Sequence, residues 1–414
     1  MITKKTGHLA AAFLMTTALA TGAAHAQQID VWTLNFSSDA ANEALQSIAE
    51  EFEEANPDVD IVFTQRGVDE HKTALRVAAG SDSGPDIFFS WAGLGLGGEY
   101  VNAGMALPMD KYYEEYGWND TLMPTAVSFA DDYEGGLHGV PFTFKGEAIY
   151  YNKTLFEKAG ITEEPTTYEE LKAAAQKLKE AGIPAITFGG TVNWHVMRLM
   201  DVLLETTCGA EVHDQLIAME ASWSETACAA EAFGELQDWA QNYFLAPFMG
   251  IDQQQSFNLF GVGRAAMMLE GNWLAQQIAE VADVDNFGIF PFPTGTNRLY
   301  GFAEYNYISA KSDNPDIAAQ FLDFMNSKEV QERHLGAYST NSVNATITYP
   351  ELRAIDAEWN EIFAAYGEMF VNGDQGFPAN VTTEYFRVIN EVAAGNMTPE
   401  DASGAMQTFI DGQS

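Results

Sequence analysis

The sequence is poor in cysteine and in positive charge, and both shortages restrict what the protein can be. Only two cysteines occur in 414 residues, too few for a multi-cysteine zinc cluster or a dense disulfide scaffold. Lysine and arginine total 20 against 59 aspartates and glutamates, which gives a net charge of −39. Such a surface repels phosphate backbones and anionic lipids, so we expect no nucleic-acid partner and no peripheral membrane contact.

The usual motifs of enzymes and membrane spans are also missing. Beyond the N-terminus, no stretch has the roughly 18 apolar residues that a membrane helix needs. No histidine pair has zinc-ligand spacing, and no Gly-x-Ser-x-Gly sequence marks a hydrolase nucleophile. The glycine-rich stretch 93–98 lacks the features of a phosphate-binding or dinucleotide loop, so we interpret it as a flexible loop before a helix. We therefore expect no catalytic residue, metal or cofactor.

The N-terminus has the pattern of a secretory signal peptide. Lys4 and Lys5 precede an apolar run at 9–20, which is too short to span a bilayer, and a small-x-small sequence ends at Ala26. We expect residues 1–26 to be removed by cleavage after Ala26, which takes the net charge from −39 to −41. No cysteine occupies the cleavage site for a lipid anchor. The mature chain should then be a soluble protein of the periplasm.

Export makes a disulfide possible between the two cysteines. Cys208 and Cys228 flank a polar segment, and their pairing would close a modest loop and stabilise the fold by about 3 kcal/mol. The alternative is a pair of buried thiols.

Hydrophobic periodicity predicts an α/β protein. Strands are expected at 29–34, 59–63 and 86–90, with helices at 40–55 and 69–80 between them. Thr167 and Glu170 form a capping box for a helix that ends at Gly182, and a strand should follow at 183–188. Further expectations are helices within 194–245 and at 272–282, strands at 265–269 and within 286–310, and a helical tail from Pro350. This alternation predicts a parallel sheet covered by helices, in about two domains.

Several segments together resemble the sugar-type, family 1 extracellular solute-binding proteins of ATP-binding-cassette importers. In chain order they are 84–87 (GPDI), 139–141 (GVP), 148–161 (AIYYNKTLFEKAGI), 165–171 (PTTYEEL), 263–267 (GRAAM), 271–273 (GNW) and 314–324 (NPDIAAQFLDF). The matches cover essentially the whole mature chain. One departure is at 301–306 (GFAEYN), where the family often has a Gly-Gly pair.

The resemblance implies a two-lobe fold of the periplasmic-binding-protein kind, with a hinge of several chain crossings and a central ligand cleft. The first lobe would comprise 27–140 plus about 301–345, and the second 141–300 plus about 346–414. It also implies a monomer that captures a carbohydrate, a mono- or oligosaccharide, and delivers it to the membrane permease of the importer.

A sugar site needs flat aromatic rings for the C–H faces and fixed polar groups for the hydroxyl edges. Trp91, Trp194 and Trp273 follow strands or precede helices, where loops face a cleft, although ordinary core packing is the alternative for each. The polar candidates lie at strand ends or in loops: Asn35, Gln65, Arg66, Lys145, Glu147, Glu304, Asn306 and Asn341. For Lys145 the alternative is a surface salt bridge.

Two other functions remain open. The excess of acidic residues would suit a binding protein for a cation such as a polyamine, although acids spread along the whole chain favour a solvated, salt-adapted surface. A secreted glycoside hydrolase needs only a pair of carboxylates, which 59 acidic residues could supply.

The charge generates a prediction about stability. Dense negative charge destabilises the compact state by self-repulsion, and salt screens that repulsion. The melting temperature, measured by calorimetry, should therefore rise as NaCl increases from low to molar concentrations. A flat or falling profile would contradict this expectation.

Overall fold

The computed structural model describes Met1 and residues 26–36, 39–131, 133–337, 341–366 and 368–413. Apart from Met1 and Ala26, the predicted signal peptide lies outside the described residues. The first strand, β1, begins at Gln27, directly after the predicted cleavage point. Among the described residues, no helix combines the length and the apolar character needed to cross a membrane.

The N-terminal part of the mature chain forms the predicted alternation of strands and helices. Its elements are β1 (Gln27–Leu34), α1 (Asp39–Ala55), β2 (Val59–Arg66), α2 (Val68–Ala79) and β3 (Ile87–Trp91). Helix α1 buries one stripe, which includes Leu45, Ile48 and Phe52, and thus packs against the sheet. Strand β1 pairs in parallel with both β2 and β3, as the alternation predicts.

The complete sheet is mixed, which corrects the expectation of a parallel one. Its remaining strands are β4 (Val140–Asn152), β5 (Met267–Gly271), β6 (Phe287–Phe290), β7 (Arg298–Ile308) and β8 (Glu368–Phe370). The order is β2-β1-β3-β7-β4-β5, with β6 beside β4 and β8 beside β7. Strand β7 runs antiparallel to β3 and β4 because it returns from the far end of the molecule rather than through a helical crossover.

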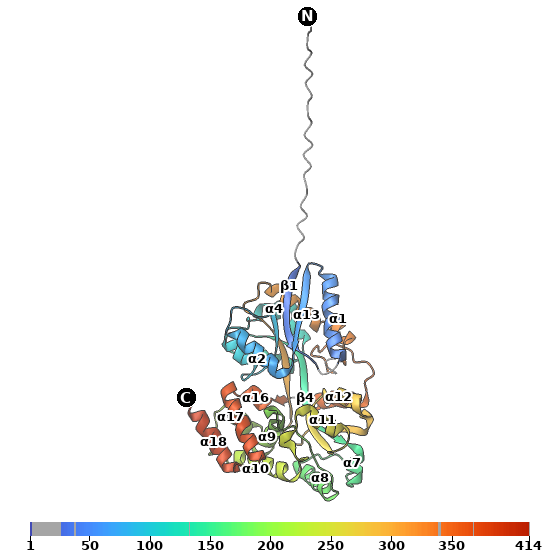
Figure 1. The fold of residues 1–414 in the computed structure, drawn as a ribbon, viewed down its shortest axis with the longest axis vertical. Coiled ribbons are helices and arrows are strands. Elements are labelled where there is room, and N and C mark those ends of the chain that lie inside the picture. The colour runs from blue at the N-terminus through green and yellow to red at the C-terminus, as the bar shows by residue number, and fades with distance from the viewer. Residues whose placement is uncertain (2–25, 37–38, 132, 338–340, 367, 414) are drawn as a thin grey trace.

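Strands β4 and β7 pass from one lobe of the molecule to the other (Figure 1). The apolar core of the first lobe takes its residues from 29–144 and 303–343, whereas the second lobe uses 148–300 and 355–406. The chain thus passes from the core of one lobe to that of the other at three places: within β4, within β7 and after residue 343. The predicted lobe boundaries, at 140/141, 300/301 and 345/346, lie near these points and stay a prediction.

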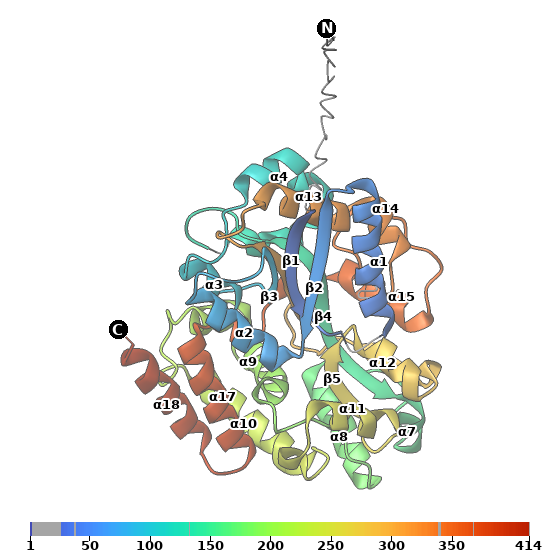
Figure 2. The same ribbon diagram turned by 45° about the horizontal axis from the view of Figure 1, so that its top comes forward.

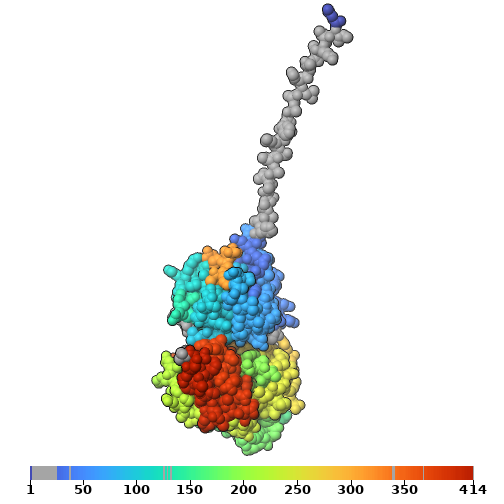
Figure 3. All heavy atoms as spheres, turned by 60° about the vertical axis from the view of Figure 1, so that its left-hand side comes forward, coloured from blue at the N-terminus to red at the C-terminus, as the bar shows by residue number. Residues whose placement is uncertain are grey.

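Helices cover the sheet in both lobes (Figures 1 and 2). The first lobe adds α3 (Gly97–Asn102), α4 (Asp110–Tyr116), α5 (Trp118–Thr121), α6 (Pro124–Val127), α13 (Pro315–Asn326) and α14 (Lys328–Arg333). The second contains α7 (Lys153–Lys158), α8 (Tyr168–Glu180), α9 (Asn193–Ile217), α10 (Ala227–Asn242), α11 (Gln253–Gly261), α12 (Leu274–Val281), α15 (Ala354–Ala365), α16 (Gly373–Gly376), α17 (Ala379–Ala393) and α18 (Pro399–Asp411). Figure 3 shows the constriction between the two lobes.

The sequence correctly predicts how α8 begins, but not the structure of the segment that follows its end. The capping box is confirmed, because the Glu170 N–H donates to Thr167 Oγ1 and the Thr167 N–H donates to Glu170 Oε2. The strand predicted at 183–188 is wrong: Ile186 makes isolated bridges to Phe244 and Met267 and no ladder extends from it. Pro184 has no N–H to donate, so the segment cannot pair regularly along its length.

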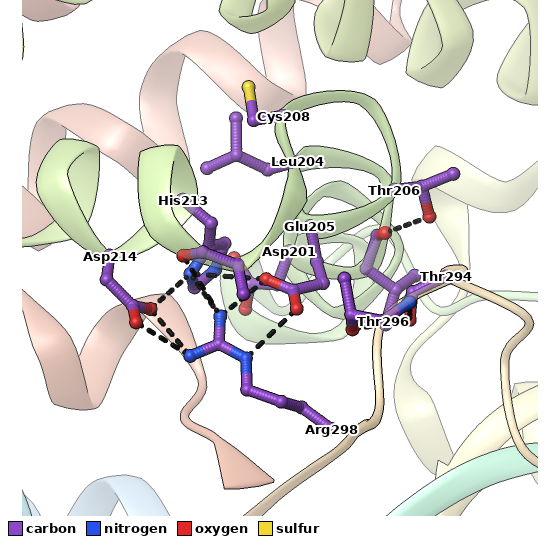
Figure 4. Close-up of polar contacts among 12 residues, drawn as sticks. Asp201, Leu204, Glu205, Thr206, Cys208, His213, Asp214, Thr294, Thr296 and Arg298 are labelled. Atoms are coloured by element: carbon purple, nitrogen blue, oxygen red, sulfur yellow. Dashed lines mark hydrogen bonds and ion pairs between the residues drawn. The ribbon is translucent and has the colours of Figure 1, made fainter. Parts of the chain in front are cut away.

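Helix α9 is interrupted at Gly209, where φ is 71° and ψ is 167°, a conformation that favours glycine. Arg298, at the start of β7, joins the two halves of the helix (Figure 4). Its guanidinium donates to Glu205 at 2.6 and 3.0 Å before the break, and to Asp214 at 2.7 and 2.9 Å after it. Partial burial raises the pKa of Asp214, but hydrogen bonds from His213 and Arg298 outweigh it and bring the pKa to about 2.

The predicted disulfide is confirmed next to this break. Cys208 of α9 and Cys228 of α10 are bonded, with their Cα atoms 5.2 Å apart. The bond therefore ties α10 to α9 at the residue directly before the interruption at Gly209.

Removing this disulfide should destabilise the protein without changing its fold. The Cys208→Ser/Cys228→Ser double variant should lose about 3 kcal/mol of unfolding free energy in a urea titration, because the unfolded chain regains the entropy of an open loop. The wild-type protein, denatured without reductant, should bind no thiol reagent, and labelling of two thiols per chain would contradict the bond.

Candidate ligand-binding site

A cleft of about 280 Å³ lies between the two lobes. Its walls combine aromatic rings, side-chain amides and charged groups. The rings are Phe36, Trp91, Trp194, Phe257, Trp273 and Phe302; the amides are Asn35, Gln253, Gln254, Gln276, Gln277, Asn372 and Gln375; the charged groups are Lys72, Lys145, Arg198, Glu304 and Asp374. Aromatic faces beside several hydrogen-bonding groups suit a ligand that has both apolar faces and polar edges.

Each lobe contributes through the ends of its elements. In the first lobe, β1 ends at the cleft with Leu34 and Asn35, and β3 ends there with Trp91. In the second lobe, α9 and α11 present their first turns, and α12 presents its start. This placement follows the rule that ligands bind beyond the carboxyl ends of strands in open α/β sheets.

Six of the ten predicted ligand-binding residues line the cleft. They are Asn35, Trp91, Lys145, Trp194, Glu304 and Trp273. The other four, Arg66, Glu147, Asn306 and Asn341, do not line it, and neither does Gln65.

The residues at the end of β2 lie one strand too far out. Arg66 stacks over the ring of Trp32 at 4.2 Å, and Gln65 donates to the Leu34 carbonyl and to Asn42. Strand β2 is the outermost strand on this side of the sheet, and the cleft is lined instead by the ends of β1 and β3, which lie further in. The sequence shows that a strand ends here but not which place the strand takes in the sheet.

Asn306 and Asn341 are buried beside the cleft rather than exposed to it. Asn306 lies within β7, opposite Phe89 of β3 and Val140 of β4. Asn341 accepts a hydrogen bond of 3.0 Å from Asn272 and donates to Asn360. The helix predicted at 272–282 begins two residues later than expected: α12 starts at Leu274, and Trp273 occupies the capping position.

Trp273 occupies a restricted position. A Cβ atom at Gly271 would lie 1.8 Å from Cζ3 of the Trp273 ring, so glycine is required for the ring to fold back over the strand end. The ring centroid lies 5.7 Å from that of Phe302, and the Trp273 side chain is only partly buried. A partly exposed ring held from behind by the backbone is a suitable platform for stacking.

Arg198 lies between two of the tryptophans. Its guanidinium carbon is 4.7 Å from the ring centre of Trp194 and 5.2 Å from that of Trp273, so cation–π contacts hold both rings. Its Nε lies 3.2 Å from Glu147 Oε1, and its Nη1 forms an ion pair with Glu270. Glu147 thus lies behind the cleft and supports a residue that lines it.

Burial governs the electrostatics of this cluster. Desolvation raises the pKa of Glu147 to about 8, although Arg198 opposes the shift. The neighbouring carboxylates raise the pKa of Arg198 in spite of its burial, so its charge is retained and balanced within the protein.

Lys145 forms a second internal pair, with Glu304. Its Nζ lies 3.7 Å from Glu304 Oε2, and both side chains are more than nine-tenths buried, so this is not the surface salt bridge that the sequence left open. Thr143 also donates to Glu304. Burial lowers the pKa of Lys145, while Glu304 opposes the change.

Asp374 differs from these carboxylates. It is 7% exposed and lines the cleft, yet among the described residues no ion pair joins it to a cation. Burial raises its pKa, and the more distant charges of Lys72 and Arg198 lower it. A buried carboxylate that faces a cleft is positioned to accept hydrogen bonds from a ligand.

Sequence reasoning missed Arg198, Asp374, Lys72 and the glutamines of α11 and α12. One signal was available for the first of these. Arg198, Asp201 and Glu205 recur at spacings of three and four within an otherwise apolar stretch of α9, which places charged side chains on one buried face of a helix. No comparable signal marks Asp374. Among the described residues, no cluster of three or more histidine, cysteine or carboxylate side chains could hold a metal ion.

Known proteins share both the sequence pattern and the fold. The family model described as "Bacterial extracellular solute-binding protein" matches residues 37–332. The maltotriose-binding protein of Pyrococcus abyssi is 28% identical over 289 residues, which are 68% of this chain and 58% of that protein. The melibiose/raffinose/stachyose-binding protein MelE of Bacillus subtilis is 22% identical over 331 residues, 76% of this chain and 74% of that protein. The match to the Pyrococcus protein thus spans little more than half of its length.

Solved structures extend the likeness to nearly the whole chain. A chitin oligosaccharide binding protein superposes with a TM-score of 0.84 at 23% identity, covering 93% of this chain and 98% of that chain. A structure from work on xylan utilization by Caldanaerobius polysaccharolyticus gives 0.84 at 25% identity, covering 92% and 100%. Both share the two-lobe arrangement. The family match over most of the chain, together with this fold, shows that the protein belongs to the bacterial extracellular solute-binding proteins.

Proposed function

We propose that the protein is a periplasmic binding protein that captures a neutral mono- or oligosaccharide and delivers it to the permease of an ATP-binding-cassette importer. The observation that carries the proposal is the set of tryptophans from both lobes, Trp91 from the first and Trp194 and Trp273 from the second, in a cleft rich in side-chain amides. Sugar rings present C–H faces that stack on indoles, and hydroxyl edges that exchange hydrogen bonds with amides.

The charges of the cleft favour a neutral ligand. Arg198 is paired with Glu270, and Lys145 with Glu304, so neither cation offers its full charge to a phosphate. Asp374 could attract a cation such as a polyamine, but Lys72 and Arg198 act on the same carboxylate and reduce that attraction. The relatives named for neutral ligands are sugar-binding proteins, whereas one from Agrobacterium fabrum is named as an sn-glycerol-3-phosphate-binding protein.

We infer that the protein binds its ligand without chemical change. A glycoside hydrolase needs two carboxyl groups facing the substrate, one of them free to move a proton. Among the described residues, two carboxylates line the cleft; Glu304 is engaged by Lys145 and Thr143, which leaves Asp374. The secreted hydrolase is therefore the weaker candidate.

Transport follows from the two lobes. We take them as 27–140 with about 301–345, and 141–300 with about 346–414, joined where the chain crosses between them. A ligand that touches both inner faces binds the closed arrangement better than the open one and shifts the population towards it. The permease would recognise the closed shape of a monomer, and the strong negative charge argues against nucleic acid or anionic lipid as a further partner.

Equilibrium dialysis against labelled solutes tests the function. The panel should contain maltotriose, xylotriose, chitotriose and a monosaccharide, with spermidine and glycerol 3-phosphate as the charged competitors. We expect a neutral sugar to bind and to be recovered intact. Binding of spermidine or glycerol 3-phosphate alone would refute the proposal, and recovery of shortened sugars would indicate an enzyme.

Replacing Trp273 by alanine should weaken binding of the sugar selected by that panel. The loss of a stacking platform should cost about 2–4 kcal/mol of binding free energy, which is roughly a thirty- to thousandfold change in affinity by calorimetric titration. Trp32→Ala is the matched control, because this indole stacks with Arg66 away from the cleft. If Trp273→Ala instead kept its affinity and lost about 3–5 kcal/mol of stability in a urea melt, Trp273 would be a core residue.

Replacing Asp374 by asparagine tests the buried carboxylate. The shape is kept but the charge is lost, so hydrogen bonds from ligand hydroxyls should weaken by about 1.5–3 kcal/mol in total. Glu368→Gln, on an exposed glutamate of β8, is the control for loss of a negative charge. Tighter binding by Asp374→Asn would show that the carboxylate repels the ligand.

A further inference from the structure

The glycine-rich stretch 93–98 forms an ordered contact between the lobes, in contrast to the flexible loop that its composition predicts. It follows β3 and is held on the first lobe by a pair of tyrosines. The Gly93 N–H donates to the Tyr133 hydroxyl at 2.9 Å, and the hydroxyls of Tyr133 and Tyr307 lie 3.0 Å apart. Both tyrosines belong to the buried core of the first lobe.

The other side of the stretch meets the second lobe. The Gly95 N–H donates to the Gln375 carbonyl at 3.0 Å. A Cβ atom at Gly95 would lie 2.1 Å from the Phe377 carbonyl oxygen and 2.3 Å from that of Asp374, so any side chain would prevent this approach. Glycine at this position is therefore a requirement of the contact between the lobes.

The segment that Gly95 touches is itself fixed to the second lobe. The Gly373 N–H donates to Asp201 Oδ2 of α9 at 2.9 Å, and Asp201 also accepts from the hydroxyls of Tyr300 and Tyr385 at 2.7 and 2.8 Å. The contact thus joins two anchored pieces of backbone, one from each lobe. It forms only when the lobes are at the separation seen here.

We propose that this Gly95–Gln375 backbone contact holds the lobes together around the cleft, and that Gly95 is a positioning residue for ligand binding. Gly95 does not line the cleft, whereas its neighbours Leu96, Asp374 and Gln375 do. The contact therefore acts on the ligand through the placement of these residues. Because apparent affinity scales with the fraction of molecules in the competent arrangement, a contact that raises this fraction raises affinity. This last step rests on the proposed function, whereas the contact does not.

Gly95→Ala is the informative variant because only the lobe contact opposes it. The φ angle of Gly95 lies outside the left-handed region, so alanine can adopt its backbone conformation once the lobes separate. Gly93 is unsuitable, since its φ of 98° would add backbone strain. Gly67→Ala is the matched control: Gly67 also lies in the first lobe, and a Cβ there would meet nothing within 4 Å.

Small-angle scattering of the unliganded proteins gives the direct test. We expect a larger radius of gyration for Gly95→Ala than for the wild type and Gly67→Ala, and a cooperative urea transition for all three, because the cores of both lobes are kept. An unchanged radius for folded Gly95→Ala would overturn the proposal. If the variant fails to fold, hydrogen exchange on the wild type decides: protection of the Gly95 amide supports the contact, and exchange at the rate of an open loop refutes it.

A second arm connects the contact to binding. With maltotriose, or whichever sugar of the panel binds the wild type, Gly95→Ala should bind roughly five- to tenfold more weakly, the scale of one lost hydrogen bond, and Gly67→Ala should match the wild type. Unchanged affinity would refute the positioning role. If no sugar binds the wild type, the proposed function fails while the scattering result still stands for the contact.

Discussion

The antiparallel pairing of β4 with β7 is the constraint on which the rest of the structure depends. These strands run through both lobes, so each lobe completes its sheet with a strand that it shares with the other. Because the crossing occurs in the middle of the pair, Lys145 and Glu304 meet where the lobes join and face the cleft. The same hydrogen bonds that stabilise the sheet therefore position part of the ligand site and limit how the lobes can move.

On the side of the second lobe, the aromatic lining of the cleft depends on contacts with the buried guanidinium of Arg198. Burying a guanidinium is costly unless carboxylates and polarisable groups surround it. Here Glu270 supplies the opposite charge, Glu147 lies beside the guanidinium, and the rings of Trp194 and Trp273 supply cation–π contacts. A charge that is balanced within the protein stiffens the aromatic walls and leaves little net attraction for an anionic ligand. The arrangement thus favours recognition by shape, stacking and hydrogen bonding.

The lobes also meet through backbone, at Gly95 and Gln375. Such a contact has no side chain to adjust, so it forms only at one separation of the lobes. A cleft whose walls come from separate lobes needs this kind of definition, since Trp91 belongs to one wall and Trp273 to the other. The glycine at position 95 permits the lobe separation at which the aromatic rings of the two lobes line one cleft.

The sequence by itself determined the elements whose signals are local. The first strands and helices, the capping box of Thr167 and Glu170, the pairing of the two cysteines and the family resemblance all depend on residues close in sequence or few in number. It also placed Trp91, Trp194 and Trp273 at element ends that reach the cleft. Only the tertiary structure decided strand order, and therefore that the end of β2, with Arg66, lies outside the lining of the cleft. Only it brought Asp374 to the cleft and Gly95 to Gln375, because contacts between residues about 280 positions apart leave no periodicity or spacing in the chain to reveal them.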